Sequence, residues 1–327
     1  MLNSLNLIKN VTKNLIIILL SFLISLIFVE IILRIKHNLR PNYDIEMWKY
    51  AKQLKVKSKN PKINHTHKKN KTAILQNVEI SINDYGQRDK NFKNFELKNY
   101  ERSFLILGSS ITLGWGVEKK NNFSSLLNSL SEKKSKNWIF VNGGVGNYNT
   151  ERYVNNYFDN WEELEFTDVI VHFFVNDTEL LDNNQINFFT KHTHVGVITW
   201  KLLNSFSAKL RKENLVNYYK EKYEDNYLGF INAKNEIIRL DKHCDEININ
   251  YHLIIMPDIH QLNPYKLNFI NKKMLEFSNQ INLNYLDLTP SFQGINEKKI
   301  WNDFLDPHPN SKGHKIIAEN IFSYLNK

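Results

Sequence analysis

Four short segments of this 327-residue chain carry residue types that suit acyl-transfer chemistry. They are Gly108-Ser109-Ser110, Asn142 to Asn147, Asn176-Asp177 and Asp306-Pro307-His308. A serine hydroxyl attacks an ester effectively only when a base removes its proton, and imidazole is the usual base. A carboxylate beside the imidazole orients the ring and stabilises its charged form. The segments therefore contain the residue types that a nucleophilic serine site needs.

Apolar stretches of strand length alternate with amphipathic helical stretches from residue 103 onward, which predicts a parallel α/β sheet. The stretch DVIVHFFV at 168–175 is almost continuously apolar and predicts a central strand covered on both faces. The other expected strands are 103–107, 138–141, 251–256 and 284–288. The expected helices include 122–131, one from Thr150, and 311–325 with Asn310 or Ser311 as its cap.

The four segments lie where such a sheet would place chemistry. In a parallel α/β sheet, functional residues gather at the carboxyl ends of the strands, because loops and helix N-termini converge there. Ser110 follows the first expected strand, Asn147 the second and Asn176 the third. Asp306 and His308 come just before the last helix. The fold is therefore expected to bring these side chains to one edge of the sheet.

The same segments resemble the four sequence blocks of the SGNH (GDSL) hydrolase family, in family order, over roughly Phe104 to His314. LILGSSITLGWGV is similar to the GDS block, VNGGVGNYNT to the glycine block, FFVNDTE to the asparagine block and LDPHPNSKGH to the acid-histidine block. The resemblance implies a three-layer α/β sandwich with a mostly parallel central sheet, of the SGNH or flavodoxin-like kind. It also implies a carboxylic ester hydrolase, with O-acyl transfer as a variant of the same acyl-enzyme chemistry.

The resemblance assigns a role to each candidate residue. Ser110 is the implied nucleophile, His308 the base that takes its proton, and Asp306 the carboxylate that orients His308. The negative oxygen that forms during attack needs hydrogen-bond donors aimed at it. The implied donors are the backbone N–H groups of Ser110 and Asn147 and the side-chain amide of Asn176.

The chain departs from the family pattern at several places. Ser109 stands where the family has the aspartate that braces the nucleophile loop, and Phe174 stands where a glycine often precedes the asparagine block. One residue, where two are commoner, separates the acid from the histidine. Gly146 is the runner-up to Asn147 as an oxyanion donor, and Asp303 is a weaker alternative acid.

An apolar segment predicts one membrane-spanning helix over 14–35, after a tail of residues 1–13. The run LIIILLSFLISLIFV at 15–29 has no charge, and about 20 apolar residues span a bilayer. Glu30 and Arg34 are four residues apart, so on a helix they pair at the headgroup level. A cleaved signal peptide is the competing interpretation, but no small-x-small cleavage site follows the run. We expect an uncleaved signal-anchor with the main domain outside the cytoplasm, in the periplasm or at an outer face.

Residues 36–100 are expected to be a basic linker and lead-in. Nine lysines and no acidic residue lie between Lys49 and Lys71, and this excess equals the formal net charge of +9. The stretch mixes these lysines with Asn, Ser and Pro, as solvated flexible segments do, so no nucleic-acid partner is expected. His65 and His67 lie there without a carboxylate or cysteine, which favours solvated linker over metal ligands.

One SGNH-like domain is expected over 101–327. An insertion near Thr178 to Leu228 is too long for a simple crossover and is predicted to cap the sheet edge. His192 and His194 in this insertion make a poor metal site without a third ligand. Cys244 is the only cysteine, which excludes an intrachain disulfide, and it is expected to fill space in the core.

The leading functional hypothesis is an ester hydrolase or O-acyltransferase that acts on an acylated sugar or lipid at the membrane surface. Its chemistry requires no metal or cofactor. The alternative from another class is a non-catalytic, membrane-tethered binding module on the same fold, because a fold does not dictate activity.

Overall fold

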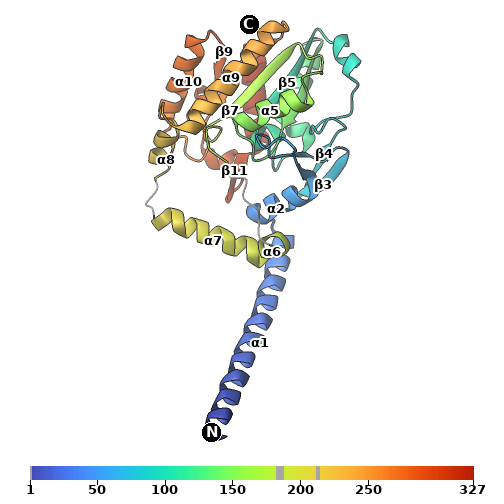
Figure 1. The fold of residues 1–327 in the computed structure, drawn as a ribbon. Helices are drawn as coiled ribbons and strands as arrows, with labels where there is room; N and C mark the ends of the chain where they lie inside the picture. The colour runs from blue at the N-terminus through green and yellow to red at the C-terminus, as the bar shows by residue number, and fades with distance from the viewer. Residues whose placement is uncertain (1, 182–187, 211–213) are drawn as a thin grey trace. The chain divides into compact units, whose positions relative to one another are not determined.

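The computed structural model describes residues 2–181, 188–210 and 214–327. The chain folds into two compact units. The helical unit is formed by Met1–Lys49 and Asn184–Lys212, and the α/β unit by Tyr50–Asn183 and Glu213–Lys327 (Figure 1). The predicted insertion is therefore divided between the two units.

A five-stranded parallel sheet forms the centre of the α/β unit, with strand order β6-β5-β7-β8-β9. The chain runs from β5 to β6 and then crosses back to β7 on the other side of β5. In sheets of this order, ligands bind beyond the carboxyl ends of the strands where the direction reverses, here between β5 and β7. The strands are β5 (Arg102–Gly108), β6 (Trp138–Gly144), β7 (Asp168–Phe174), β8 (Asn250–Met256) and β9 (Asn284–Asp287).

Helices cover both faces of the sheet because successive side chains of a strand point to opposite faces. Leu105 and Leu107 of β5 point into one core, and Phe104 and Ile106 point into the other. The helices of the first core are α5 (Thr150–Asn160), α9 (Leu228–Glu246) and α10 (Asn268–Gln280); those of the second are α4 (Phe123–Lys133), α11 (Thr289–Phe292) and α12 (Ser311–Leu325). This is the three-layer sandwich with a parallel central sheet that the sequence predicts.

The predicted elements of the α/β unit are confirmed, with small shifts at their ends. The expected strand 138–141 continues to Gly144, and the expected last helix coincides with α12. Asn310 caps α12, since its side chain accepts the N–H groups of Lys312 and Gly313. Cys244 is buried in α9 as expected. The remaining short helices are α3 (Ser110–Leu113), α8 (Leu215–Lys222), η1 (Asn94–Asn99), η2 (Lys119–Asn121) and η3 (Glu297–Lys299).

The residues before the sheet form hairpins, so the expectation of a flexible linker is wrong here. β1 (Lys55–Lys57) pairs with β2 (His65–His67), and β3 (Lys71–Leu75) pairs with β4 (Val78–Ile82), both antiparallel. The expected solvated histidines are buried: His65 is 8% exposed and His67 is 3% exposed. They share a face because they lie two residues apart on a strand.

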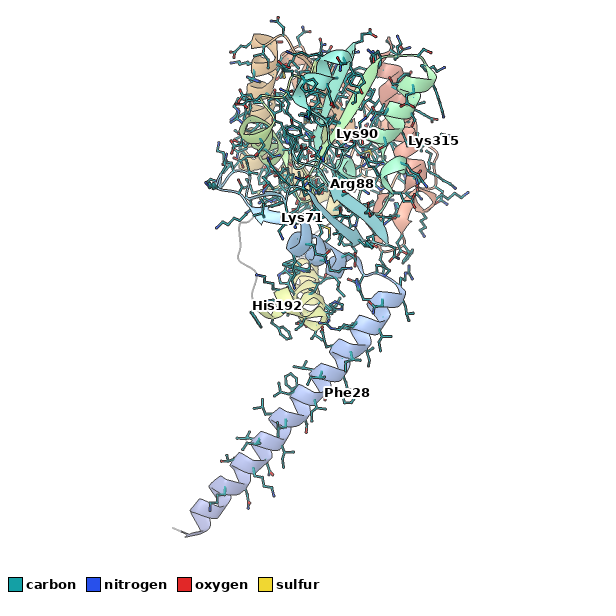
Figure 2. All side chains as sticks on the ribbon, turned by 90° about the vertical axis from the view of Figure 1, so that its right-hand side faces the viewer. Phe28, Lys71, Arg88, Lys90, His192 and Lys315 are labelled. Atoms are coloured by element: carbon teal, nitrogen blue, oxygen red, sulfur yellow. The ribbon has the colours of Figure 1, made fainter. Side chains whose placement is uncertain are left out.

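The helical unit contains α1 (Leu2–Leu39), the first part of α2 (Tyr43–Leu54), α6 (Phe188–His192) and α7 (His194–Leu210). Lys9–Leu39 of α1 is long and apolar enough to cross a membrane. Its side chains project outward along the helix, as Figure 2 shows around Phe28. Residues 182–187 and 211–213 of the predicted insertion lie outside the described residues, and the cap over the sheet edge stays a prediction.

Candidate active site

Ser110 lies two residues after the end of β5, at the first residue of α3. The chain turns tightly at Gly108, where an added Cβ would lie 2.3 Å from Oγ1 of Thr112. The N–H of Leu113 then closes the turn on the carbonyl of Ser109 at 2.9 Å. Glycine at the strand end therefore lets the backbone change direction and leaves Ser110 at the carboxyl edge of the sheet.

Asp306 and His308 lie on a short strand, β11 (Asp306–Pro309), which pairs antiparallel with β10 (Trp301–Asp303). Residues two apart on a strand point to the same side. With one residue, Pro307, between them, both side chains reach the same side of the hairpin. The short spacing that departs from the family pattern is thus compatible with contact between the acid and the histidine.

The structure brings Ser110, His308 and Asp306 into one hydrogen-bonded series. Oγ of Ser110 lies 2.8 Å from Nε2 of His308, and Nδ1 of His308 lies 2.6 Å from Oδ1 of Asp306. Because an ionised carboxylate only accepts, Nδ1 carries the ring proton and Nε2 accepts from the serine hydroxyl. This is the arrangement in which the imidazole takes the serine proton during attack.

Asp306 is buried and held in its ionised form. Burial alone would raise the pKa of its carboxyl, but hydrogen bonds from His308 and Asn302 hold that pKa below its ordinary value. Nδ2 of Asn302 donates to the second carboxylate oxygen at 3.0 Å. The alternative acid, Asp303, instead accepts the N–H of Leu305 at 3.1 Å. The geometry therefore favours Asp306 over Asp303 as the partner of His308.

The two asparagines expected to bind the oxyanion follow the strands on either side of β5. The register places Gly108 of β5 beside Gly144 of β6 and His172 of β7. Asn147, shortly after β6, is exposed and has a φ of +64°, a left-handed conformation that asparagine tolerates. Asn176, shortly after β7, is half-buried. Both residues thus lie at the carboxyl edge that carries Ser110.

The runner-up donor, Gly146, uses its backbone groups for contacts inside the protein. Its N–H donates to the hydroxyl of Tyr50 at 2.9 Å, and its carbonyl lies 3.1 Å from Nε2 of His65. A Cβ at this position would lie 2.7 Å from the Tyr50 ring, so the close approach requires glycine. These contacts favour Asn147 over Gly146 as the oxyanion donor.

Tyr50, His65 and His67 form a buried support behind the loop that carries Asn147, and the sequence interpretation missed it. The Tyr50 hydroxyl lies 2.6 Å from Nε2 of His67, whose Nδ1 lies 2.8 Å from the carbonyl of Gly86. Burial lowers the pKa of His67 to about 4, so the ring is neutral, with its proton on Nδ1. The Tyr50 hydroxyl therefore donates to His67 while it accepts from Gly146. The alternation His65-Thr66-His67 was the available signal for a half-buried strand.

A second buried network holds the loop after Ser110. Nδ2 atoms of Asn122 and Asn142 donate to the carbonyl of Thr112 at 3.1 and 2.7 Å. Ser109, in the place of the family's aspartate, makes no side-chain capping hydrogen bond. Arg88, labelled in Figure 2, is 2% exposed and donates to four carbonyls at 2.6 to 3.0 Å, those of Glu79, Leu113, Gly114 and Val117. Arg88 and two asparagines therefore brace the loop after Ser110.

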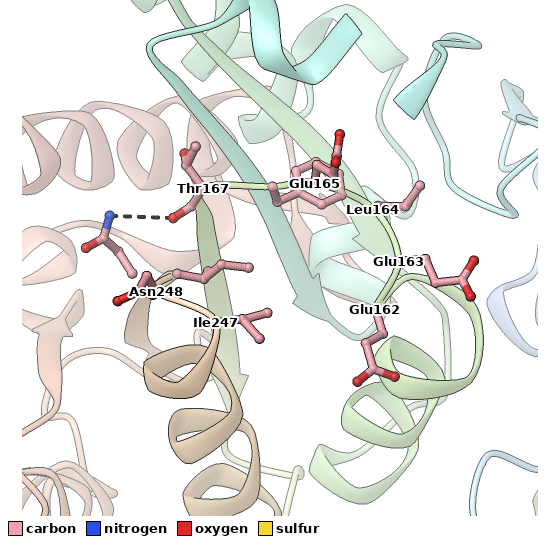
Figure 3. Close-up of a pocket in the computed structure, with 10 residues that line it drawn as sticks. Glu162, Glu163, Leu164, Glu165, Thr167, Ile247 and Asn248 are labelled. Atoms are coloured by element: carbon pink, nitrogen blue, oxygen red, sulfur yellow. Dashed lines mark hydrogen bonds between the residues drawn. The ribbon is translucent and has the colours of Figure 1, made fainter. Parts of the chain in front are cut away.

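A hollow of about 360 Å³ lies at the other end of the sheet. It is lined by residues that precede or begin β7 and β8, among them Glu162, Glu165, Thr167 and Asn248 (Figure 3). Because Ser110 lies at the carboxyl ends of the strands, this hollow is not part of the candidate site. Within the described ranges, no three His, Cys, Asp or Glu side chains are grouped to hold a metal ion.

No family model and no curated protein sequence matches the chain. Among solved structures, a lipolytic protein of the G-D-S-L family from Desulfitobacterium hafniense is 11% identical, with a TM-score of 0.43, covering 68% of this chain and 99% of that one. An α/β hydrolase from the metagenome of Lake Arreo is 14% identical, with a TM-score of 0.48 and coverages of 69% and 96%. An acetylxylan esterase from Geobacillus stearothermophilus is 13% identical, with a TM-score of 0.46 and coverages of 70% and 95%. Similarities this distant assign no chemistry to this chain.

Proposed function

We propose that this chain is a serine-dependent ester hydrolase or O-acyltransferase, acting through an acyl-enzyme on an acylated sugar or lipid at a membrane surface. The observation that carries the proposal is the hydrogen-bonded series from Ser110 through His308 to Asp306, at 2.8 and 2.6 Å. A surface serine that only caps a helix has no need of a histidine and a buried, ionised carboxylate aligned behind it.

The proposed reaction proceeds in two halves. Oγ of Ser110 attacks the ester carbonyl while its proton passes to Nε2 of His308, and the carbonyl π electrons move onto the oxygen. The N–H groups of Ser110 and Asn147 and the Asn176 amide stabilise that oxygen. Collapse breaks the ester bond, and His308 protonates the departing alkoxide. Water or an acceptor hydroxyl then attacks the acyl-serine, giving its proton to His308, and Ser110 is released with its proton restored.

Labelling by a fluorophosphonate tests the nucleophile in the full chain purified in detergent. We expect wild-type protein to be labelled at Ser110, and Ser110→Ala to be unlabelled and folded. Ester turnover in Ser110→Ala and His308→Ala is expected to fall by roughly 10⁴-fold or more. Folded wild-type protein that neither reacts nor hydrolyses esters across a series of acyl chain lengths would favour the binding module instead.

Hydrolysis and transfer differ only in the group that removes the acyl chain from Ser110. Adding a carbohydrate or glycerol acceptor to a turnover assay separates them, because a transferase forms the new ester while total release of the first alcohol continues. A hydrolase yields only free acid at every acceptor concentration.

The membrane location is supported by the length and composition of α1. An uncleaved anchor predicts that protein isolated from membranes still contains residues 1–39, which intact-mass spectrometry detects directly. A mature chain that begins after α1 would identify the segment as a cleaved signal sequence. Protease protection of α/β-unit peptides in intact cells would show on which side of the membrane the unit lies.

A further inference from the structure

Helix α7 begins against the end of the apolar run of α1. The carboxylate of Glu30 accepts the N–H groups of His194 and Val195 at 3.1 and 2.9 Å. Arg34 pairs with the same carboxylate at 2.7 Å. The first N–H groups of a helix have no partner within the helix, and a carboxylate there satisfies them and favours the helix dipole. These hydrogen bonds hold the first turn of α7 beside the residue of α1 that follows the uncharged run 15–29.

Two side chains on one side of α7 contact the first part of α2. Trp200 contacts Trp48 edge to face, with ring centroids 6.0 Å apart. Lys201 forms an ion pair with Asp44. Figure 1 shows α7 starting near the C-terminal end of α1 and running out to one side. With 17 residues, α7 extends about 26 Å in that direction.

The opposite side of α7 and the preceding α6 expose apolar side chains. Val195, Ile198 and Leu202 have the spacing of one helical face; Val195 and Ile198 are half-buried, and Leu202 is 64% exposed. Phe188 and Phe189 of α6 are 79% and 45% exposed. Water-soluble proteins rarely group large apolar side chains on an open helix face, and such groups indicate contact with a protein or a membrane.

We propose that α6 and α7 lie in the interfacial layer of the bilayer that α1 crosses, so that the helical unit contacts lipid through a span and through an in-plane helix. Lipid is the expected partner of this apolar surface, because Glu30 connects the start of α7 to the end of the apolar run of α1, where the membrane boundary would lie. An apolar helix face with Lys191 and Lys201 at its polar margin has the composition of helices that lie about 5–10 Å deep at the boundary between headgroups and acyl chains. The inference requires α1 to span the membrane and is independent of any role for Ser110.

Spin labels on adjacent turns test this placement in the full chain. Cys244 is buried, and burial raises the pKa of its thiol to about 12, so the natural cysteine stays unlabelled. Leu202→Cys places a label on the open apolar face, and Asn204→Cys places a matched control on the other side of the helix. Both proteins are reconstituted into phosphatidylcholine–phosphatidylglycerol vesicles and recovered by flotation.

The label at 202 is expected to be relaxed several-fold more by oxygen than by a water-soluble nickel chelate, with the ratio reversed at 204. Equal, nickel-accessible labels at both positions in floated vesicles would overturn the proposal. A label at 202 that is shielded from both reagents and shows spin–spin broadening at higher protein density would also overturn it, in favour of a second copy of this chain.

Discussion

Nε2 of His65 lies 3.1 Å from the carbonyl oxygen of Gly146, and that carbonyl belongs to the same planar peptide as the N–H of Asn147. A carbonyl only accepts, so Nε2 donates the hydrogen bond. The bond fixes the peptide plane, and by polarising the amide it strengthens the N–H as a donor. His65 is therefore a positioning residue for the proposed oxyanion donor, although it comes from a hairpin far away in the sequence.

Replacing His65 by leucine removes this hydrogen bond. We expect kcat of ester hydrolysis to fall about 10- to 100-fold with little change in KM, because an oxyanion donor acts mainly in the transition state. His65→Gln retains a side-chain N–H and is expected to recover most of the loss. Steady-state kinetics of the three proteins measures the effect. Equal losses in both variants, in step with equal losses of thermal stability, would show that His65 only supports the fold.

The hydrogen bond from Asn302 is expected to keep the carboxyl group of Asp306 ionised, so that it can orient His308. Replacing Asn302 by leucine leaves one oxygen of a buried carboxylate without its donor, which costs about 1.5–3 kcal/mol and predicts a fall in kcat/KM of roughly tenfold or more. Asn296→Ala, which removes the side-chain cap of η3, serves as the control and is expected to leave kcat/KM within about twofold.

The pH dependence of stability tests the same contact. The pKa of Asp306 is lowered in the folded state, so its ionised form stabilises the fold above the ordinary carboxyl pKa, and this stabilisation is lost as the pH falls through the lowered value. Asn302→Leu is expected to move that loss to higher pH, measured as urea midpoints between pH 3 and 7. Superimposable profiles for wild type and variant would show that Asn302 has no influence on Asp306.

The central sheet, and the edge of it at which the candidate residues meet, could be predicted from short-range patterns in the sequence. Apolar runs with a period of two or 3.6 mark β5 to β9 and their helices, and parallel strands bring their carboxyl ends together whatever the loops contain. The positions of Ser110 and His308 could therefore be anticipated. Their contact at 2.8 Å depends on the short hairpin that carries His308, whose strands are too brief to show a period.

The support behind the oxyanion loop could not be anticipated, because its contacts connect distant parts of the sequence. Tyr50 reaches Gly146 across 96 positions, and His65 reaches the same residue across 81. Locally, the surrounding lysines resemble a solvated linker, and strands of three residues give almost no pattern. The lysine-rich composition correctly predicted the exposed side chains of the β1–β2 hairpin, but it gave no sign that His65 and His67 are buried.

Lys55 makes stability rise with pH as Asp306 does, but in the alkaline range and because its charged form is the unfavourable one. Its ammonium lies 4.5 Å from the centre of the Tyr50 ring, which favours the charged form, but burial and the nearby Arg152 lower its pKa to about 7. Between pH 7 and the ordinary lysine value near 10.4, the unfolded state then binds more protons, so the free energy of unfolding rises with pH. We expect Lys55→Met to be more stable than wild type at pH 7 by about 1–3 kcal/mol, less than the full pKa difference implies because the side chain is partly exposed.

Urea denaturation at pH 7 and pH 9.5 measures this effect, and the advantage of Lys55→Met is expected to shrink at the higher pH. Lys57→Met, which replaces an exposed lysine of the same strand, serves as the control and is expected to change neither value by more than about 0.5 kcal/mol. An advantage that is the same at both pH values would mean that Lys55 affects stability through packing and not through its charge.

Ser109 provides the sharpest comparison with the family pattern, since it stands where that pattern has a bracing aspartate. Its side chain is buried, yet it makes no capping hydrogen bond, while Asn142 donates to the carbonyl of Thr112 at 2.7 Å and accepts the N–H of Gly144 at 2.9 Å. We expect Ser109→Ala to keep kcat/KM within about twofold, and Asn142→Leu to lose at least about 2 kcal/mol of stability because it leaves buried partners unsatisfied. Steady-state kinetics measures kcat/KM of both variants, and urea unfolding midpoints measure their stability. A fall of more than tenfold in kcat/KM for a stably folded Ser109→Ala would return the bracing role to Ser109, and the buried asparagines and Arg88 would then support only the fold.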